Sequence, residues 1–307
     1  MKIAILGATS QIAKDLIVSF SIEQDKQLHL FARRPNDVRK WLKDVGLLER
    51  YLVDDFGVFG IQTFDAILNF VGVGNPAQAA AMGASIFDVT LQYDDLALNY
   101  VRQNPTCRYI FLSSGAAYGS SFNAPVDAET KASIPINNLQ PKDWYGVAKL
   151  YAESRHRVQP ELPIIDIRVF NYFSRTQDMN ARFFITDIVR AIRDHAVLQT
   201  SSEYMVRDFI GPGDFYQLIK VILSSPPNND VLDCYSKAPI DKPSLLNAMQ
   251  ERFGLKYETS ETKTSVNATG SKSHYFSLNN KAKNYGYQPT LSSLEGLLIE
   301  VESLING

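Results

Sequence analysis

The first half of the chain alternates short apolar segments with stretches of helical periodicity. The apolar segments predict strands at Lys2 to Leu6, Gln27 to Phe31, Tyr51 to Val53, Asp65 to Val71, Arg108 to Leu112 and Ile164 to Val169. Several are continuously apolar rather than alternating, which is typical of strands buried on both faces. Helical patterns lie between them, at Gln11 to Phe20, Asn36 to Lys43, Pro76 to Gln103 and Trp144 to Val158. This repeated strand–helix–strand order predicts an α/β fold with a doubly wound parallel sheet.

The pattern loses its regularity after about residue 170, and polar turns become frequent. Prolines and small polar residues gather at Gly211 to Gly213 and at Ser224 to Asn229, and the composition of Thr259 to Ser273 predicts an exposed loop. A last helix is expected at Leu291 to Ile305. We therefore expect a Rossmann-type domain at residues 1–170 and a smaller C-terminal α/β lobe at residues 171–307, with the chain crossing back to the sheet.

The composition is that of an ordinary globular protein. Of the 307 residues, 45% are hydrophobic and 21% are charged, which provides an ample core. The net charge of -2 gives no indication of a polyanionic partner, so nucleic acid is not expected. No apolar segment reaches the length of a membrane span, so a membrane is not expected as a partner either.

The cysteines and histidines give no indication of a metal site or a disulfide. Cys107 and Cys234 lie far apart and match no metal or disulfide pattern, so the reducing cytoplasm is the expected location. No pair of histidines has the spacing of metal ligands, and we interpret each as a surface or packing residue: His29, His156, His195 and His274.

A strand, a tight turn and the start of a helix follow one another in Ile3 to Ala13. The dinucleotide fingerprint has three glycines here, for the turn, for the approach of a pyrophosphate and for helix packing. Only Gly7 is present, and the small residues Ser10 and Ala13 take the other two positions. Ser10 can cap the helix and also donate to a phosphate. The alternative is a strand–turn–helix without a ligand. The candidate phosphate-binding residues are Gly7, Thr9, Ser10, Gln11 and Ile12.

The end of the second predicted strand carries Arg33 and Arg34 and no carboxylate. A site that prefers NAD has an acidic residue at this point, whereas the guanidinium fork suits a 2′-phosphate. The sequence therefore favours NADP over NAD, with solvated arginines as the alternative. After the third predicted strand, Asp55 and Phe56 are candidates for contacting the adenine ring. Asp54 competes for that role, and a plain helix N-cap is an equally good interpretation of the aspartate.

Tyr145 and Lys149 are four residues apart in a predicted helix, so their side chains lie on one face. A nearby ammonium favours the phenolate, and we expect it to lower the pKa of Tyr145 toward neutrality. The tyrosine would then serve as a general acid or base at a carbonyl or an alcohol. This spacing also arises by chance, and the alternative is an aromatic residue and a charge on an amphipathic helix.

Several segments form an ordered series along the chain. They are Gly7 to Ala13, Asn69 to Gly72, Phe111 to Gly119, Tyr145 with Lys149, Arg168 to Asn171, Val206 to Asp214, and Ala282 to Pro289. In this order they resemble the motifs of the extended short-chain dehydrogenase/reductases, in the branch of nucleotide-sugar epimerases, dehydratases and reductases. The resemblance covers nearly the whole chain, and together the segments are far more specific than any one of them.

The resemblance implies hydride transfer between a nicotinamide and a sugar carbon, with proton transfer at the sugar oxygen. Ser114 would hydrogen-bond the reacting oxygen and Tyr145 would donate or accept the proton. Lys149 would hold the nicotinamide ribose and lower the pKa of the tyrosine. The N-terminal domain would bind NAD(P) and the C-terminal lobe the substrate. The remaining implied positions are Val71 and Gly72 under the cofactor, and Asn171 and Arg207 at the diphosphate of a nucleotide-linked sugar.

Departures from the family pattern narrow the activity. Gly115 and Ala116 stand where a sugar 4,6-dehydratase has an Asp-Glu pair, so dehydratase activity is not expected. The two arginines after the second strand favour an NADP-dependent 4-keto-sugar reductase. The alternative is an NAD-dependent nucleotide-sugar 4-epimerase, and a more distant one is a non-catalytic NADP-binding sensor. The resemblance also implies a homodimer formed through the helices near Ala77 to Gln103 and Trp144 to Val158.

Overall fold

Seven parallel strands form the main sheet of the computed structural model, which describes residues 1–73, 79, 81–120, 122–260 and 272–306. Their order across the sheet is β11–β6–β5–β4–β1–β2–β3. The prediction of a doubly wound parallel sheet is confirmed. The strands are β1 (Lys2–Leu6), β2 (Gln27–Phe31), β3 (Leu52–Asp54), β4 (Ala66–Asn69), β5 (Arg108–Ser114), β6 (Ile164–Val169) and β11 (Asp230–Asp233).

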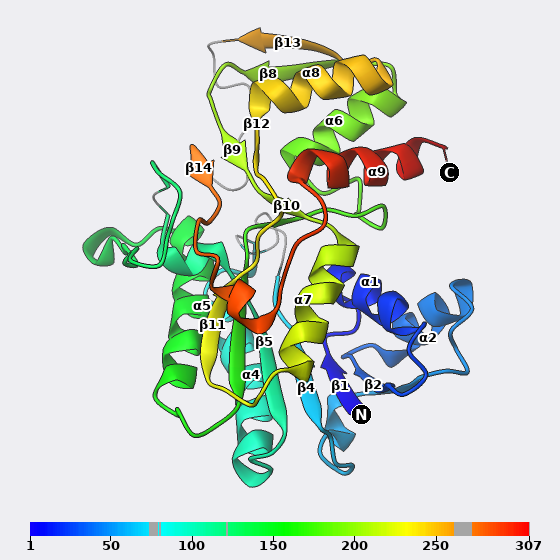
Figure 1. Cartoon of the computed structure of the whole chain (residues 1–307), viewed down its shortest axis with the longest axis vertical. Coiled ribbons are helices and arrows are strands. Elements are labelled where there is room, and N and C mark those ends of the chain that lie inside the picture. Colours follow the sequence, from blue (N-terminus) through cyan, green and yellow to red (C-terminus); the bar gives the residue numbers. More distant parts are fainter. Residues whose placement is uncertain (74–78, 80, 121, 261–271, 307) are drawn as a thin grey trace.

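Helices cover both faces of this sheet (Figure 1). One face packs against α1 (Gln11–Phe20), α2 (Pro35–Asp44) and α7 (Pro212–Ser224), and the other against α4 (Ser85–Gln103) and α5 (Pro141–Arg157). In β1 the side chains of Ile3 and Ile5 join the first core, whereas Ala4 and Leu6 join the second. This burial on both faces explains why the strand reads as a continuous apolar segment.

A second core lies in the upper part of Figure 1. It is built from α6 (Phe184–Arg193), β8 (Val197–Ser201), α8 (Lys242–Phe253), β13 (Lys256–Ser260) and α9 (Ser293–Asn306). Five strands of two residues each lie in the segments that connect this core to the main sheet: β7 (Asn171–Tyr172), β9 (Val206–Arg207), β10 (Phe209–Ile210), β12 (Ile240–Asp241) and β14 (His274–Tyr275). Short 3-10 helices are η1 (Phe56–Val58), η2 (Gly115–Tyr118), η3 (Ile136–Asn138) and η4 (Lys281–Tyr285).

The chain crosses between the two cores more than once. After α6 and β8 it returns to the main sheet as α7 and β11, and it leaves again through β12 and α8. Residues of η4 and Tyr287 also pack in the core of the main sheet. The domain boundary at residue 170 therefore stays a prediction. The two lobes are not two continuous stretches of sequence, because α7 and β11 follow that boundary and belong to the main sheet.

The predicted elements of the first half differ from the observed ones mainly at their ends. The strand predicted at Asp65 to Val71 is shorter at both ends, and the one at Arg108 to Leu112 extends to Ser114. The predicted loop at Thr259 to Ser273 is wrong at its start, because Thr259 and Ser260 pair with β8 in β13. Two predicted elements lie partly outside the described residues: the loop at residues 261–271, and the helix expected at Pro76 to Gln103 at residues 76–78 and 80.

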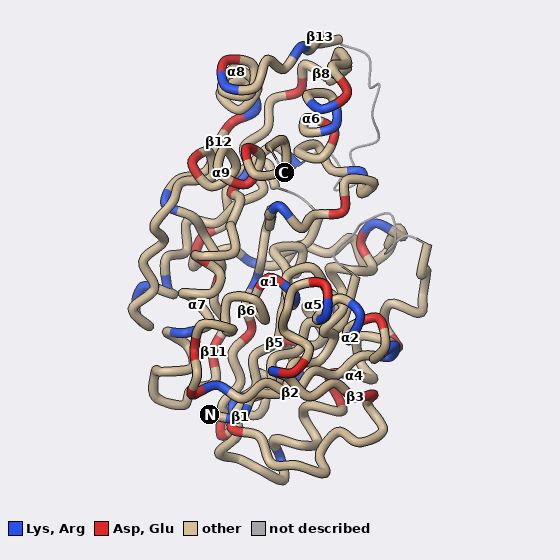
Figure 2. The backbone as a smooth tube through the Cα atoms, turned by 90° about the vertical axis from the view of Figure 1, so that its right-hand side faces the viewer, with Lys and Arg blue, Asp and Glu red and all other residues tan. Residues whose placement is uncertain are grey.

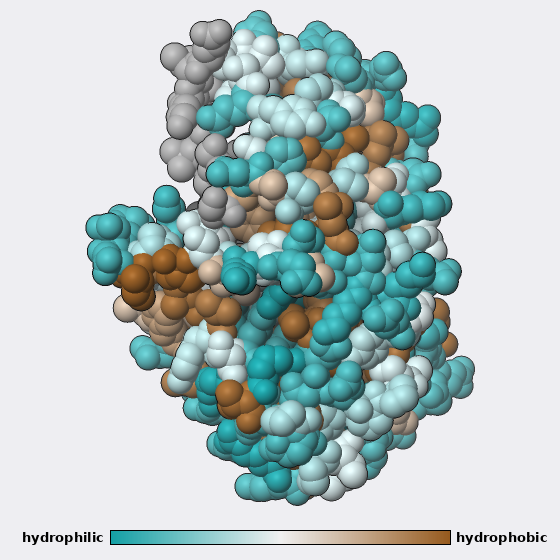
Figure 3. Space-filling model, turned by 60° about the vertical axis from the view of Figure 1, so that its left-hand side comes forward, coloured by the Kyte–Doolittle hydropathy of each residue, from teal (hydrophilic) through white to brown (hydrophobic). Residues whose placement is uncertain are grey.

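The surface carries charges of both signs. Basic and acidic positions are interspersed along the backbone in Figure 2, and hydrophobic patches interrupt a largely hydrophilic surface in Figure 3. Within the described ranges, no helix is long and apolar enough to cross a membrane. In the same ranges no three His, Cys, Asp or Glu side chains are arranged to hold a metal ion, and both cysteines are buried and free.

Candidate active site

The strand order reverses direction at β1, which has β2 on one side and β4 on the other. In open α/β sheets, ligands bind in the crevice outside the carboxyl ends of the strands at such a point. A cavity of about 970 Å³ lies there, lined by residues at the carboxyl ends of the main sheet's strands and by residues of the C-terminal lobe. Every site residue predicted from the sequence lines it except Asp55. The fold therefore brings together residues that lie up to 200 positions apart, from Gly7 to Arg207.

The turn after β1 leaves room only for glycine. Gly7 has φ +80°, and a Cβ atom there would lie 2.8 Å from the backbone nitrogen of Val71 and 2.9 Å from the carbonyl carbon of Phe70. Ser10 occupies the N-cap position of α1, but its side chain makes no capping hydrogen bond. The turn thus places the N-terminus of a helix against the cavity with a close backbone approach, which is the shape that a pyrophosphate requires.

The cavity is rich in cations at the end of β2. Arg34 is 78% exposed, and its Nε lies 3.0 Å from Oδ2 of Asp37. Arg33 forms no ion pair or hydrogen bond through its side chain within the described part of the chain. Lys14 of α1, which is not among the residues predicted from the sequence, also lines the cavity, and its Nζ lies 5.3 Å from the centroid of the Trp41 ring. No sequence motif would have placed this lysine beside the arginines.

The residues after β3 divide into one that lines the cavity and one that does not. Phe56 lines it and packs against Tyr93, with ring centroids 4.6 Å apart. The Asp55 carboxylate instead accepts a hydrogen bond of 2.7 Å from the backbone nitrogen of Gly57. This is the N-cap interpretation of Asp55. Its competitor Asp54 lies 2.8 Å from Nε2 of His29 and is therefore held beside β2.

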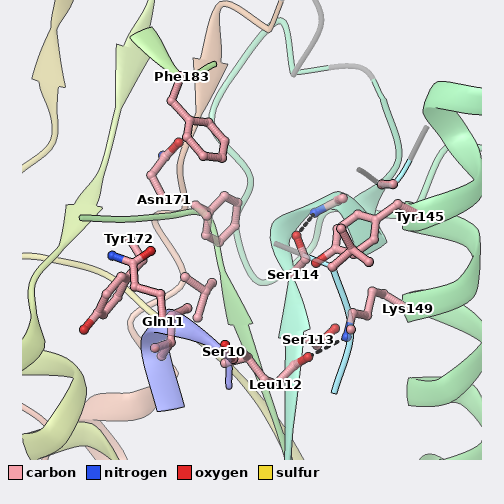
Figure 4. Close-up of a pocket in the computed structure, with 18 of the residues that line it drawn as sticks. Ser10, Gln11, Leu112, Ser113, Ser114, Tyr145, Lys149, Asn171, Tyr172 and Phe183 are labelled. Carbon is pink, nitrogen blue, oxygen red and sulfur yellow. Dashed lines mark hydrogen bonds between the residues drawn. The ribbon is translucent and has the colours of Figure 1, made fainter. Parts of the chain in front are cut away.

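Two hydroxyl groups meet at the far end of the cavity. Ser114 ends β5 and its Oγ accepts a hydrogen bond of 3.1 Å from the backbone nitrogen of Ala116. Figure 4 shows its side chain and that of Tyr145 on α5 pointing toward each other, and the serine hydroxyl is the group that lowers the pKa of Tyr145 against the effect of burial. The neighbouring Ser113 donates instead to Glu153, because alternate residues of a strand point to opposite faces. The fold therefore brings Ser114 and Tyr145 to the same part of the cavity, and their roles in a reaction stay a prediction.

Lys149 is buried beneath this pair. Its Nζ donates a hydrogen bond of 2.7 Å to the carbonyl oxygen of Leu112 and lies 4.3 Å from the Phe111 ring centroid (Figure 4). Burial lowers the pKa of Lys149 to about 8, although Asp94 and other carboxylates partly oppose the shift. The ammonium is 5.8 Å from the Tyr145 ring centroid.

The expected effect of Lys149 on Tyr145 is wrong. Burial raises the pKa of Tyr145, and the hydrogen bond from Ser114 only partly offsets it. The helical spacing places the lysine one turn away, but its ammonium donates to Leu112 rather than to the tyrosine hydroxyl. The tyrosine is therefore protonated at neutral pH. In this state it can donate a proton to a substrate oxygen.

The C-terminal lobe adds a second tyrosine. The buried Tyr275 of β14 has its hydroxyl 3.4 Å from Oγ of Ser114, although the two residues are 161 positions apart. The side-chain nitrogen of Asn171 donates to the carbonyl oxygens of Asp208 and Tyr275, at 3.0 and 3.5 Å. Asn171 thus holds the strand that carries Tyr275, and its contact with a diphosphate stays a prediction. The sequence motifs did not reveal Tyr275.

Gly146 allows α5 to approach η2 closely, because a Cβ atom there would overlap the carbonyl oxygen of Ala116. We expect Gly146→Ala to destabilise the protein by about 1–3 kcal/mol. We also expect a loss of activity of about 100-fold, because Tyr145 would shift away from Ser114. Urea unfolding and steady-state kinetics measure the two effects. Gly213→Ala in the first turn of α7, where the added Cβ meets open space, is the control. Wild-type activity in Gly146→Ala would contradict the prediction.

A Rossmann-type sheet with a glycine turn and a Ser–Tyr–Lys group on one cavity defines an NAD(P)-dependent enzyme. The chain belongs to the NAD dependent epimerase/dehydratase family, whose model matches residues 3–234. This confirms the resemblance seen in the sequence motifs.

Two curated relatives come from Oryza sativa subsp. japonica. UDP-glucose 4-epimerase 2 is 32% identical over 140 residues, which cover 42% of this chain and 29% of that protein. UDP-glucose 4-epimerase 4 is 30% identical over 176 residues, which cover 54% of this chain and 40% of that protein. The matches thus span less than half the length of either relative.

Solved structures match over the full chain. UDP-glucuronic acid 4-epimerase from Bacillus cereus, in complex with UDP-glucuronic acid and NAD, has a TM-score of 0.78 at 17% identity, covering 100% of this chain and 99% of that one. UDP-glucose 4-epimerase from Thermotoga maritima, with UDP-glucose, has a TM-score of 0.78 at 16% identity, covering 98% of both chains. At this identity the likeness establishes the fold alone.

Proposed function

We propose that the chain is an NADP-dependent oxidoreductase that reduces the 4-keto group of a nucleotide-linked sugar. One observation carries the proposal. A single cavity joins the Gly7 turn and the cationic end of β2 to the hydroxyls of Ser114 and Tyr145. No acidic residue directly follows β2 in the sequence, which supports NADP, and the raised pKa of Tyr145 supports a proton donor, as reduction requires.

The residues of the candidate site each have a part in the proposed reaction. The Gly7 turn and the Val71 backbone would hold a dinucleotide, which when bound would supply the hydride to the carbonyl carbon of the sugar. Tyr145 donates the proton to the carbonyl oxygen, and Ser114 donates a hydrogen bond to the same atom. Lys149 has three N–H groups and uses one on Leu112, so two are left for ribose hydroxyls.

A 4-epimerase is the second candidate function. The curated relatives named above are UDP-glucose 4-epimerases, which favours this reading and also a uridine nucleotide. In that reaction Tyr145 would first accept a proton and later return it. A homodimer through α4 and α5 and a cytoplasmic location belong to the proposal in either case.

The stoichiometry of the dinucleotide separates the two functions. The purified protein is given NADPH with a UDP-4-keto-hexose, and separately UDP-glucose with NAD. We expect one NADPH to be consumed for each keto sugar reduced, with no UDP-galactose formed in the second reaction. Conversion of UDP-glucose to UDP-galactose without net loss of dinucleotide would establish the epimerase instead. Turnover in neither reaction, and in none of the corresponding reactions of other nucleotide-linked sugars, would contradict both functions and leave the non-catalytic sensor.

Arg33 is expected to determine the choice of dinucleotide. A guanidinium bonded to a phosphate contributes about 1.5–3 kcal/mol, so Arg33→Gln should weaken NADP binding by about 10–100-fold. NAD binding should change less than about threefold on the same argument, because NAD lacks the 2′-phosphate. Isothermal titration with both dinucleotides measures the difference. Arg34→Gln is the matched comparison, with a smaller loss expected because Arg34 already pairs with Asp37. Equal losses for NADP and NAD in Arg33→Gln would remove the argument for NADP.

A further inference from the structure

A buried carboxylate of α1 lies behind the cavity wall. Asp15 is 7% exposed and does not line the cavity, so it is not placed to touch a ligand. It accepts hydrogen bonds from three hydroxyl groups of one short segment: Tyr172 at 2.8 Å, Ser174 at 2.6 Å and Thr176 at 2.7 Å. The three are spaced two residues apart, as side chains on one side of an extended chain are. A single aspartate thus holds the stretch that begins in β7.

The residues tied to Asp15 line the cavity from two different parts of the chain. Gln11, in the first turn of α1, is a candidate phosphate-binding residue, and its Nε2 donates a hydrogen bond of 2.8 Å to Oγ of Ser174. Tyr172 and Thr176 line the cavity from the segment after the main sheet. In Figure 4, Gln11 and Tyr172 lie on the side of the cavity opposite to Tyr145. The helix after the phosphate turn and this segment therefore meet at one hydrogen-bonded cluster.

A second carboxylate holds the same segment from the C-terminal lobe. The backbone nitrogen of Arg175 donates to Oε2 of Glu300 on α9 at 2.7 Å, and its guanidinium bonds both oxygens of that carboxylate at 3.0 Å. Glu300 is 8% exposed, nearly the same as Asp15. Phe173 of the segment and the buried residues of α9 belong to the same core. The Glu300 bonds thus stay within one lobe, whereas the Asp15 bonds reach across to α1.

The buried position of Asp15 makes this link sensitive to displacement. Burial raises the pKa of Asp15, and the three hydroxyl donors oppose the rise. A shift of the segment away from α1 would leave a buried acceptor without its donors, which is costly. The segment and the start of α1 are therefore held in one arrangement. Hydrogen-bond networks of this kind carry energetic coupling between the sites that they join.

We propose that Asp15 is a positioning residue that couples the dinucleotide side of the cavity to the nucleotide-sugar side. It acts on Gln11 through Ser174, and it acts directly on Tyr172 and Thr176. A dinucleotide bound at the turn after β1 then raises the affinity for the nucleotide-linked sugar, and the reverse holds by the same factor. This inference rests on the proposed function, because it assumes that both ligands occupy the cavity.

Isothermal titration of the full-length protein measures the coupling. NADPH or NADH, whichever binds more tightly, is titrated with and without saturating nucleoside diphosphate, taken as the tightest of UDP, dTDP, GDP and CDP. The reverse titration must give the same factor. We expect each ligand to raise the affinity of wild type for the other by about 5–150-fold, the usual range for coupled sites. Asp15→Asn should lower this factor to less than about twofold, because an amide cannot accept from three hydroxyls as a carboxylate does.

Two further variants separate positioning from general stiffening of the segment. Glu300→Gln makes the same change of carboxylate to amide, at similar burial and on the same segment, and should keep the wild-type coupling factor. Thr176→Val removes one donor to Asp15 at an exposed position, where the fold is spared. Its coupling factor should lie between those of wild type and Asp15→Asn, and it carries the test if Asp15→Asn does not fold.

The other outcomes are distinct. An unchanged coupling factor in Asp15→Asn, or in Thr176→Val where Asp15→Asn does not fold, would overturn the inference, and so would an equal loss in Glu300→Gln. Wild-type protein that binds both ligands independently would also overturn it while leaving the proposed function intact. Wild-type protein that binds neither dinucleotide, or none of the four nucleoside diphosphates, would contradict the proposed function, and the inference with it.

Discussion

Tyr145→Phe is expected to lower turnover by about 10²–10⁴-fold, the usual contribution of a positioned proton donor. The substitution keeps the ring and removes only the hydroxyl that meets Ser114. The Gly7 turn and Lys149 are untouched, so dinucleotide binding should change by less than about twofold on the same reasoning. Steady-state kinetics and a dinucleotide titration on the same preparation measure both quantities.

Tyr151→Phe provides the matched control on the same helix. Tyr151 is 53% exposed and lies outside the cavity wall, so its hydroxyl has no part in the reaction. We expect wild-type turnover from that variant. If Tyr145→Phe also turned over at the wild-type rate, Tyr145 would not be the proton donor, and the proposed mechanism would be wrong.

The sheet could be predicted because each strand carries its own signal. Ile3 to Leu6 is continuously apolar, Ile164 to Val169 is apolar except at Asp166 and Arg168, and the structure buries nearly all of both segments. The short strands after residue 170 carry no such signal. The β9 and β14 strands have two residues each and pair only because the surrounding lobe holds them together. Their register depends on contacts between distant segments, which local periodicity does not encode.

The candidate site follows the same division. Gly7, Ser114, Tyr145 and Lys149 belong to segments whose spacing indicates chemistry, and all four line one cavity. Tyr275 has no such motif and reaches Ser114 only through the fold of the C-terminal lobe. The pKa of Tyr145 was mispredicted for a related reason. Spacing along a helix fixes how near Lys149 lies, but the direction of its ammonium is set by Leu112 on a different element.

His156 illustrates the same limit in the core. The sequence gives it no special role, yet it is fully buried between two carboxylates on other elements. Its Nε2 lies 2.7 Å from Oδ1 of Asp94 on α4, and its Nδ1 lies 2.6 Å from Oδ1 of Asp166 on β6. Burial alone would lower the pKa of His156, but the carboxylates outweigh it and raise the pKa to about 9. The histidine is therefore charged at neutral pH. Its two carboxylate partners connect α5 to α4 and to β6 of the main sheet.

Asp94→Asn is expected to destabilise the protein by about 3–5 kcal/mol, which is typical when one partner of a buried ion pair is removed. Asp94 is fully buried and also accepts from Tyr109, at 2.9 Å, and from Arg155, at 2.7 Å. An amide cannot accept from all three groups with the strength of a carboxylate. Urea unfolding at pH 6.5 measures the loss. Asp95→Asn is the control, because Asp95 pairs with the same Arg155 but its side chain is 42% exposed, and such a pair contributes about 0–1 kcal/mol.

The pH dependence of unfolding tests the origin of this loss. Because folding raises the pKa of His156 from 6.5 to about 9, its contribution to stability is fully present below pH 6.5 and is lost as the pH rises through about 9. Asp94→Asn removes one of the two carboxylates that raise this pKa. The difference in free energy of unfolding between wild type and Asp94→Asn should therefore narrow between pH 6.5 and 9, whereas Asp95→Asn should run parallel to wild type. A constant gap for Asp94→Asn would mean that the lost stability comes from packing and not from the charged histidine.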